Sequence, residues 1–401
     1  MNTNWRRSTL GLLLVAMITL AACTTQAVPT PEPSTPSSPT APATPPPSEE
    51  PSQAPSEQPE PSAPPTVDWE AADVPDTRNA SGVVSIVPGG DGFVAIGFDG
   101  GFGSFLWTSA DGRAWRDVTP AGFESFGIAS VVEHDGMLIG VGRGNTIDVD
   151  AEEAAVYLSE DGLEWRKVET AEQLVGQMID VVSTDDGLYA VGGVPGADSA
   201  GIWHSTDGET WTRTGGDFEH SFMWAIAEGG PGLVAVGWRR NPDPSAAVWT
   251  SPDGVEWTMS PDPEGFELFE GTDVLTTDDG TLVMVGSSFT GQGGQMWFSE
   301  DGVDWELAEV AGGLEGRYAR TAVRTPAGII AVGGSEEMAA SAWISTDGRS
   351  WEPLGEPHDG AYFNAAYVTD DGLLAMGATQ AGAVETGIEA YAMIWTAALD
   401  D

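Results

Sequence analysis

Hydrophobic residues between residue 80 and the C-terminus fall into short runs separated by turns rich in Asp and Gly. One kind of run begins and ends with Gly, as in GFVAIG at 92–97 and GLVAVG at 232–237. A short apolar segment precedes each such run, and an aromatic segment such as AVWTS at 247–251 follows it. None shows helical spacing, so the pattern predicts β-strands. The seven runs begin at Gly92, Gly136, Gly187, Gly232, Gly280, Gly328 and Gly372.

After the aromatic segment comes a seven-residue motif, Ser-x-Asp-Gly-x-x-Trp, which occurs six times at intervals of 46 to 50 residues. This period is typical of one propeller blade. Asp-Gly between strands predicts a tight turn, because Gly adopts positive φ easily and the Asp and Ser oxygens accept backbone N–H groups. We therefore interpret the motifs as structural corners whose Trp packs between blades. Their fixed residues are Asp111, Asp161, Asp207, Asp253, Asp301, Asp347, Trp115, Trp165, Trp211, Trp257, Trp305 and Trp351.

The seventh period ends with its aromatic segment at 392–396 and lacks the motif. The missing strand is expected at the other end of the domain, where VDWEAADV at 67–74 parallels VDWELAEV at 303–310. The sequence thus predicts an all-β fold: a seven-bladed β-propeller of four-stranded antiparallel blades, closed by the N-terminal strand.

The motif resembles the Asp-box, or BNR, repeat of sialidases and related β-propellers, over residues 67–401. In that family the box is a turn on the outer part of each blade, and it occurs in enzymes, binding proteins and assembly factors alike. A sialidase-like site would need several converging arginines and a Tyr/Glu pair. Within residues 67–401, only Arg78, Arg143, Arg239 and Arg240 lie outside the boxes and outside the three arginines of one blade entry. We therefore assign no catalytic residue.

The first 66 residues differ in composition from the rest of the chain. Arg6 and Arg7, an apolar stretch at 10–20 and Leu-Ala-Ala-Cys at 20–23 are typical of an export signal. The last four residues are similar to the lipobox of bacterial lipoproteins, and this resemblance implies that Cys23 is acylated. Residues 24–66, rich in Pro, Ser and Thr, cannot build a core and predict a disordered stalk. We expect a signal peptide at 1–22, a lipidated linker at 23–66 and the propeller at 67–401.

The formal net charge of −47 changes which partners are expected. Such a field repels phosphate backbones and anionic lipids, so we expect no nucleic-acid binding and membrane contact only through the lipid anchor. Cys23 is the single cysteine, so disulfides are excluded. The predicted protein is an exported monomer, anchored to the bacterial membrane with its propeller outside the cell or in the cell wall or periplasm.

Acidic residues accompany aromatic ones at five of the seven blade entries, and they are a candidate ligand face; the alternative is that the rings wedge between blades while the acids face water. The candidate acids are Glu124, Glu219, Glu267, Glu315 and Asp359.

Alternating carboxylates at Asp148, Asp150 and Glu152 suit Ca²⁺, although the segment lacks the glycine of an EF-hand loop and also fits a solvated acidic loop. No cofactor is required.

These features favour a cell-surface lipoprotein whose propeller binds or scaffolds a glycan or an envelope protein. The alternative is a sialidase-like or other carbohydrate-active secreted enzyme.

Overall fold

The computed structural model describes residues 67–75, 80–99, 103–123, 127–144, 153–169, 174–194, 198–240, 242–260, 265–369, 372–380 and 390–398. The expected signal peptide, Cys23 and stalk lie outside these residues. The chain divides into two units, Met1–Glu60 and Pro61–Asp401, and the described residues all belong to the second. No helix in this described part is long and apolar enough to cross a membrane.

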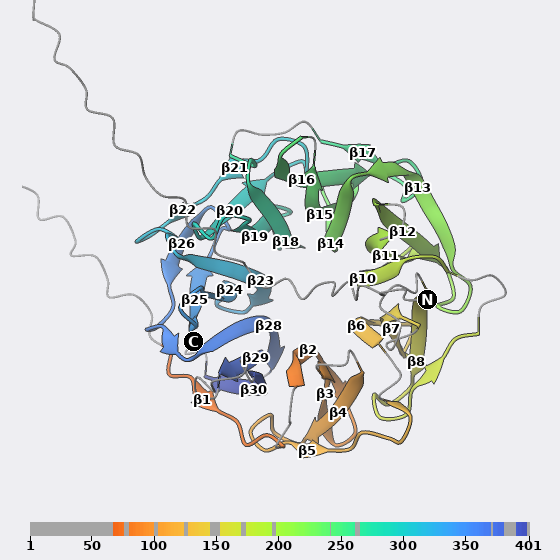
Figure 1. The fold of residues 1–401 in the computed structure, drawn as a ribbon, viewed down its shortest axis with the longest axis vertical. Coiled ribbons are helices and arrows are strands. Elements are labelled where there is room, and N and C mark those ends of the chain that lie inside the picture. Colours follow the sequence, from red (N-terminus) through yellow and green to blue (C-terminus); the bar gives the residue numbers. More distant parts are fainter. Residues whose placement is uncertain are drawn as a thin grey trace, which may run out of the picture. The chain divides into compact units, whose positions relative to one another are not determined.

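Seven antiparallel sheets surround a central axis, and this confirms the predicted seven-bladed propeller (Figure 1). From the innermost strand outward, blade 1 is β2 (Ala80–Gly89), β3 (Gly92–Asp99), β4 (Ser104–Ser109) and β5 (Arg116–Asp117). Blade 2 is β6 (Gly127–His134), β7 (Met137–Arg143), β8 (Ala154–Ser159) and β9 (Arg166–Lys167). Blade 3 is β10 (Gln177–Thr184), β11 (Gly187–Val194), β12 (Ser199–Ser205) and β13 (Thr212–Glu219).

The other four blades repeat this order. Blade 4 is β14 (Ser221–Gly229), β15 (Gly232–Arg240), β16 (Pro244–Ser251) and β17 (Thr258–Met259). Blade 5 is β18 (Phe269–Thr276), β19 (Leu282–Ser288), β20 (Gly294–Ser299) and β21 (Glu306–Leu307). Blade 6 is β23 (Arg317–Thr325), β24 (Gly328–Ser335), β25 (Ala339–Ser345) and β26 (Ser350–Pro353). Blade 7 is β28 (Ala361–Thr369), β29 (Gly372–Gln380), β30 (Ala390–Ala397) and β1 (Glu70–Ala71).

The two ends of the propeller close the ring as predicted. Strand β1 pairs antiparallel with β30, with Glu70 opposite Thr396. The chain then continues to blade 1, where the N–H of Asp73 donates to the carbonyl of Arg113 at 2.8 Å and the N–H of Trp115 donates back to Asp73 at 2.7 Å. The N-terminal segment therefore completes blade 7 and also ties it to blade 1.

One short strand departs from the predicted all-antiparallel blades. Strand β22 (Glu309–Val310) leaves blade 5 and pairs in parallel with β26 of blade 6. Together with β27 (His358–Asp359), which pairs with β25, it enlarges the sheet of blade 6 to six strands. The partner of Glu309 is Ser350, which occupies the motif position that Ala114 occupies in blade 1, so this link is equivalent to the one made by Asp73.

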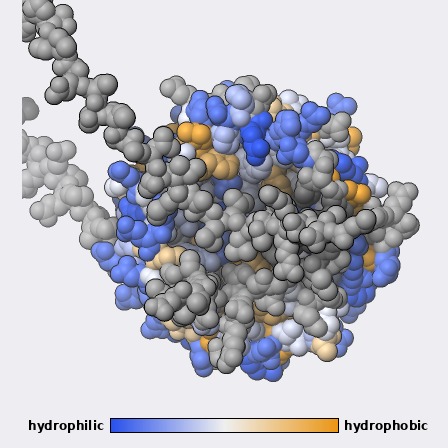
Figure 2. Space-filling view, in the orientation of Figure 1, coloured by the Kyte–Doolittle hydropathy of each residue, from blue (hydrophilic) through white to orange (hydrophobic). Residues whose placement is uncertain are grey.

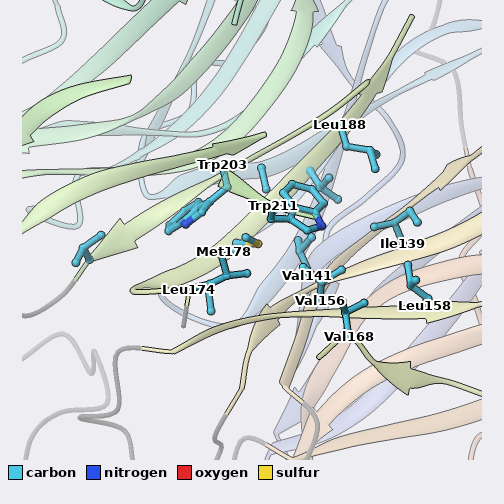
Figure 3. Packing of buried hydrophobic residues seen from close by; sticks show 14 residues of the cluster. Ile139, Val141, Val156, Leu158, Val168, Leu174, Met178, Leu188, Trp203 and Trp211 are labelled. Carbon is cyan, nitrogen blue, oxygen red and sulfur yellow. The ribbon is translucent and has the colours of Figure 1, made fainter. Parts of the chain in front are cut away.

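The hydrophobic core lies between neighbouring blades. In the cluster drawn in Figure 3, Val141 and Val156 of blade 2 pack with Met178 and Trp203 of blade 3. The third strand of each blade contributes a large aromatic side chain that is at most 1% exposed: Trp107, Trp203, Trp249, Trp297, Trp343 and Trp395, with Tyr157 in blade 2.

Each copy of the repeated motif forms the same hydrogen-bonded turn. In blade 4 the Ser251 hydroxyl accepts the N–H of Gly254 at 2.8 Å. One carboxylate oxygen of Asp253 accepts the N–H groups of the second and third residues after it, both at 2.9 Å. Gly254 has a φ of 70°, and the indole N–H of Trp257 donates to its carbonyl at 3.1 Å. All four fixed residues thus have a physical role in the turn.

The glycine that ends each hydrophobic run faces a bulge in the innermost strand. In blade 4 the ladder registers Met223 with Gly237 and Ala225 with the preceding residue, so Trp224 has no partner. A Cβ on Gly237 would lie 2.0 Å from the carbonyl oxygen of Phe222, which is backbone and cannot rotate away. Equivalent backbone contacts of 1.8 to 2.1 Å occur at Gly142, Gly192, Gly286, Gly333 and Gly377.

We predict that Gly237→Ala lowers the free energy of unfolding by roughly 3 kcal/mol, the upper range for overpacking, because the clashing atom is backbone. A matched control is Gly216→Ala, whose new Cβ meets nothing closer than 3.9 Å. The control should change stability by less than about 0.5 kcal/mol. Urea denaturation of both variants measures the difference, and equal stabilities would refute the steric role of the bulge.

Candidate functional site

The acids of the predicted ligand face do not gather with their aromatic neighbours. Glu219, Glu267, Glu315 and Asp359 are exposed near the starts of the innermost strands, and Glu124 lies outside the described residues. Some of the neighbouring rings are buried in the core; Phe266, for example, is 1% exposed and packs edge-on against Trp297 at 5.4 Å. This arrangement favours the alternative in which rings wedge between blades while acids face water.

The expected Ca²⁺ ligands Asp148, Asp150 and Glu152 lie outside the described residues. Within the described ranges, no group of three or more His, Cys, Asp or Glu side chains is placed to hold a metal ion.

A different group of side chains gathers at the end of the ring where the innermost strands begin. Its centre is a continuous row of aromatic rings. Phe222 of β14 lies 4.6 Å from Trp224 and stacks on Trp238 of β15 at 6.5 Å with an interplanar angle of 10°. Trp238 then meets Phe289, in the turn after β19, edge-on at 6.3 Å. Phe289 is 39% exposed, so this end of the row reaches solvent.

Local pairing explains how two blades build this row. Phe222 and Trp238 are directly opposite in the β14–β15 ladder, which brings their rings together. Trp224 is the unpaired residue of the bulge. Phe289 is held at the row because its N–H donates to the carbonyl of Leu268 at 2.8 Å, at the entry of blade 5.

Two rings of the row each carry an arginine. The guanidinium carbon of Arg240 is 5.6 Å from the centre of the Trp238 ring, and that of Arg320 is 5.7 Å from the Trp224 ring. Glu270 lies beside Arg320, and its two oxygens accept the Trp224 indole N–H at 3.0 Å and the Ser287 hydroxyl at 3.1 Å. We call this group the mouth site: Phe222, Trp224, Trp238, Arg240, Glu270, Phe289 and Arg320.

Two tyrosines lie within the electrostatic reach of Arg320. Burial raises the pKa of Tyr318 and of Tyr362, and the positive charge of Arg320 partly opposes that shift. Both phenols are therefore protonated at neutral pH. Arg320 of the mouth site belongs to the blade entry 317–324, whose three arginines the sequence analysis did not count among those free to form a clamp.

A histidine–carboxylate pair borders the mouth site. Nδ1 of His220 is 2.6 Å from a carboxylate oxygen of Asp198, and the N–H of Arg240 donates to the His220 carbonyl at 2.8 Å. His220 and Asp198 have φ values of 57° and 49°, a left-handed conformation that costs a non-glycine residue about 1 to 3 kcal/mol. Such strain gathers at functional sites. The residue that precedes the innermost strand in blades 3, 6 and 7 is glycine: Gly176, Gly316 and Gly360.

Deeper in the ring, two aspartates on the innermost strands bridge neighbouring blades. Asp180 accepts the hydroxyl of Ser130 from blade 2 at 2.8 Å and the N–H of Ile226 from blade 4 at 3.0 Å. Asp273 accepts the hydroxyl of Thr321 at 2.5 Å and the N–H of Ala322 at 2.9 Å, both from blade 6. Burial raises the pKa of both carboxyls, to about 6 for Asp273, where repulsion from Asp180 adds to the effect.

At the opposite end of the ring, a hollow of about 650 Å³ lies among the turns of blades 2 and 3. Carboxylates line much of it, and His134 is held there at 2.8 Å from the Ser183 hydroxyl.

No protein-family model and no curated protein matches this chain. Among solved structures, polysaccharide lyase Uly1 is similar with a TM-score of 0.51 at 11% identity, over 82% of this chain and 92% of that one. The structure of YjhT has a TM-score of 0.44 at 12% identity, over 75% of this chain and 98% of that one. A Trypanosoma rangeli sialidase mutant displaying trans-sialidase activity has a TM-score of 0.43 at 14% identity, over 82% of this chain and 60% of the sialidase. At 11% identity the likeness to Uly1 shows the β-propeller fold alone.

We predict that Asp273→Asn reduces the loss of stability on going from pH 4.5 to pH 8. The pKa of Asp273 is raised to about 6 by burial, so the folded state holds this proton more tightly than the unfolded state does. Its contribution is full below the unfolded pKa and is lost as pH rises through about 6, with a limit of roughly 2 to 3 kcal/mol. Asparagine keeps an acceptor for Thr321 and Ala322 without ionising.

Urea denaturation at several pH values measures this effect. Asp359→Asn, at an exposed position, controls for the general relief of negative charge. Parallel pH profiles for wild type and Asp273→Asn would contradict the assignment.

Proposed function

We propose that this protein is a lipid-anchored cell-surface protein whose propeller binds an extracellular saccharide at the mouth site. The single observation that carries the proposal is the row of four rings, in contact with one another and open to solvent at Phe289. Aromatic faces offer rigid apolar area that suits the C–H faces of sugar rings, while polar groups at the edges recognise hydroxyls.

The polar groups of the mouth site support the same ligand class. Glu270 and the two arginines border the rings, and Ser287 shares the Glu270 carboxylate. Sugars present many hydroxyls that both donate and accept hydrogen bonds, so a site with guanidinium donors and a carboxylate acceptor around rings matches them. The fold similarity to a polysaccharide lyase is consistent with this ligand class.

The expected anchor and stalk add the cellular setting. Acylated Cys23 would hold the chain at the membrane, and the Pro-rich segment would extend the propeller away from it. The acidic surface would keep the exported domain soluble at its working site.

Affinity electrophoresis identifies a polysaccharide that the wild-type propeller retains. We predict that Trp238→Ala weakens binding to this polysaccharide by about tenfold, because the row loses the ring that contacts Phe222, Phe289 and Arg240. Trp238→Phe should retain most of the affinity. Leu307→Ala on β21, at a residue 55% exposed on the outer strand of blade 5, is the control for general surface effects. Unchanged affinity for Trp238→Ala would exclude the aromatic row as the binding surface.

A carbohydrate-active enzyme is the second candidate, and the His220–Asp198 pair is the observation that favours it. In the tautomer in which Nδ1–H donates a hydrogen bond to Asp198, Nε2 is left as an acceptor, the arrangement used in general acid–base catalysis. The pair lies beside Arg240 at the mouth site.

Depolymerisation assays on the retained polysaccharide test this candidate. We predict for an enzyme that His220→Asn, which tolerates the left-handed backbone, lowers turnover at least about a hundredfold with little change in affinity. Absence of turnover by the wild-type protein would leave binding as the function.

A further inference from the structure

We propose that the saccharide is an anionic polysaccharide whose acidic groups bind Arg240, on the Trp238 ring, and Arg320, on the Trp224 ring. This inference rests on the proposed function and adds the chemical class of the ligand. Carboxylate and sulfate groups share the chemistry that a guanidinium recognises, so both are included in the test.

Both guanidiniums are held in place, yet neither forms a close ion pair with a described carboxylate. Each lies on a Trp face, which fixes its plane by a cation–π contact and leaves its edge donors available. Arg240 is exposed and makes no ion pair with a carboxylate of the described residues. Arg320 approaches Glu270 only to 3.9 Å, because the Glu270 oxygens already accept Trp224 and Ser287.

Some arginines on the outer parts of the blades do have a close carboxylate partner. Arg113 pairs with Glu70 at 2.9 Å, and Arg349 pairs with Glu300 at 2.8 Å. The chain has 62 acidic and 15 basic residues, so a close carboxylate partner is easy to supply. The mouth site thus holds two arginines and one carboxylate, Glu270, on a strongly negative protein.

The two guanidiniums lie on different rings of the row. Between Arg240 and Arg320 lie the rings of Trp238, Phe222 and Trp224 in succession. A chain of sugar units with acidic groups on more than one unit can lie along the rings and reach both guanidiniums.

The net charge of −47 repels a polyanion at long range. Binding of such a polymer therefore requires local cationic contacts, whereas binding of a neutral polysaccharide does not. Affinity for an acidic polymer should depend strongly on the two arginines, and affinity for a neutral one should not.

The experiment uses the full propeller with two matched pairs of polymers: polygalacturonate with its carboxyl-reduced neutral form, and dextran sulfate with dextran. We expect at least one acidic polymer to bind about tenfold more tightly than its neutral partner. Arg240→Gln and Arg320→Gln should each remove about that advantage, and Arg240→Lys should restore part of it because the charge remains while the bidentate geometry is lost.

Arg349→Gln is the matched control, because Arg349 also lies on an aromatic ring, that of Phe298 at 4.9 Å, but belongs to an outer turn. It should leave both affinities unchanged. Melting curves show whether each variant is folded. If the Gln variants do not fold, Arg240→Lys still tests the proposal, because its affinity for the acidic polymer should fall while its positive charge remains.

The outcomes separate the two proposals. Equal affinity for acidic and neutral partners, or Gln variants that bind like wild type while Trp238→Ala does not, would overturn the anionic ligand and leave saccharide binding intact. Failure of every polymer to bind would overturn both. Preference for polygalacturonate alone identifies the acidic group as carboxylate, and preference for dextran sulfate alone identifies it as sulfate.

Discussion

Each sheet of this propeller buries its two faces against its two neighbours, and only a closed ring gives all seven sheets both neighbours. The seven hydrophobic clusters each combine residues from two adjacent blades. A gap at the junction of the last and first blades would expose two of these faces at once. The pairing of β1 with β30, followed by the Asp73 link to blade 1, closes that junction with residues from both ends of the domain. Every other feature of the molecule depends on this closure.

Within the closed ring, the outer and inner parts of each blade have different tasks. The outer turn uses Ser, Asp, Gly and Trp for hydrogen bonds that allow little substitution, so it repeats in sequence. The innermost strand instead contains a bulge opposite a glycine. Only the backbone atoms of the bulged residue take part in this bulge, so its side chain is not involved. The bulged residue is therefore free to vary, and it is Trp224 in blade 4 and Arg320 in blade 6, two members of the mouth site.

This division explains which features the sequence reveals. The blades, their number and the closing strand follow from local patterns repeated at a constant period, and the structure confirms them. The mouth site joins Trp224, Glu270 and Arg320 from three blades, and their meeting depends on bulges and ring closure that no local pattern encodes. The acids at the blade entries form a repeat that is visible in the sequence. In the structure these acids are exposed while rings such as Phe266 are buried, so the two kinds of side chain do not form one surface. One sequence signal could have revealed part of the mouth site. Blade 4 has aromatic residues on two successive strands, in FMW at 222–224 and GW at 237–238, and strand pairing places Phe222 opposite Trp238.

The carboxylates show the same contrast between periphery and centre. Backbone N–H groups lower the pKa of the turn aspartates Asp111, Asp161, Asp207, Asp253 and Asp301, so these residues stabilise the fold above pH 3.8 and lose that contribution as they protonate. Burial raises the pKa of Asp180 and Asp273, so ionisation of these residues opposes folding as pH rises. Hydrophobic isosteres would avoid that cost but would leave the N–H groups of Ile226 and Ala322 without these acceptors. The inner carboxylates therefore have a structural role: they accept backbone N–H groups of neighbouring blades, close to the strands that carry the mouth site.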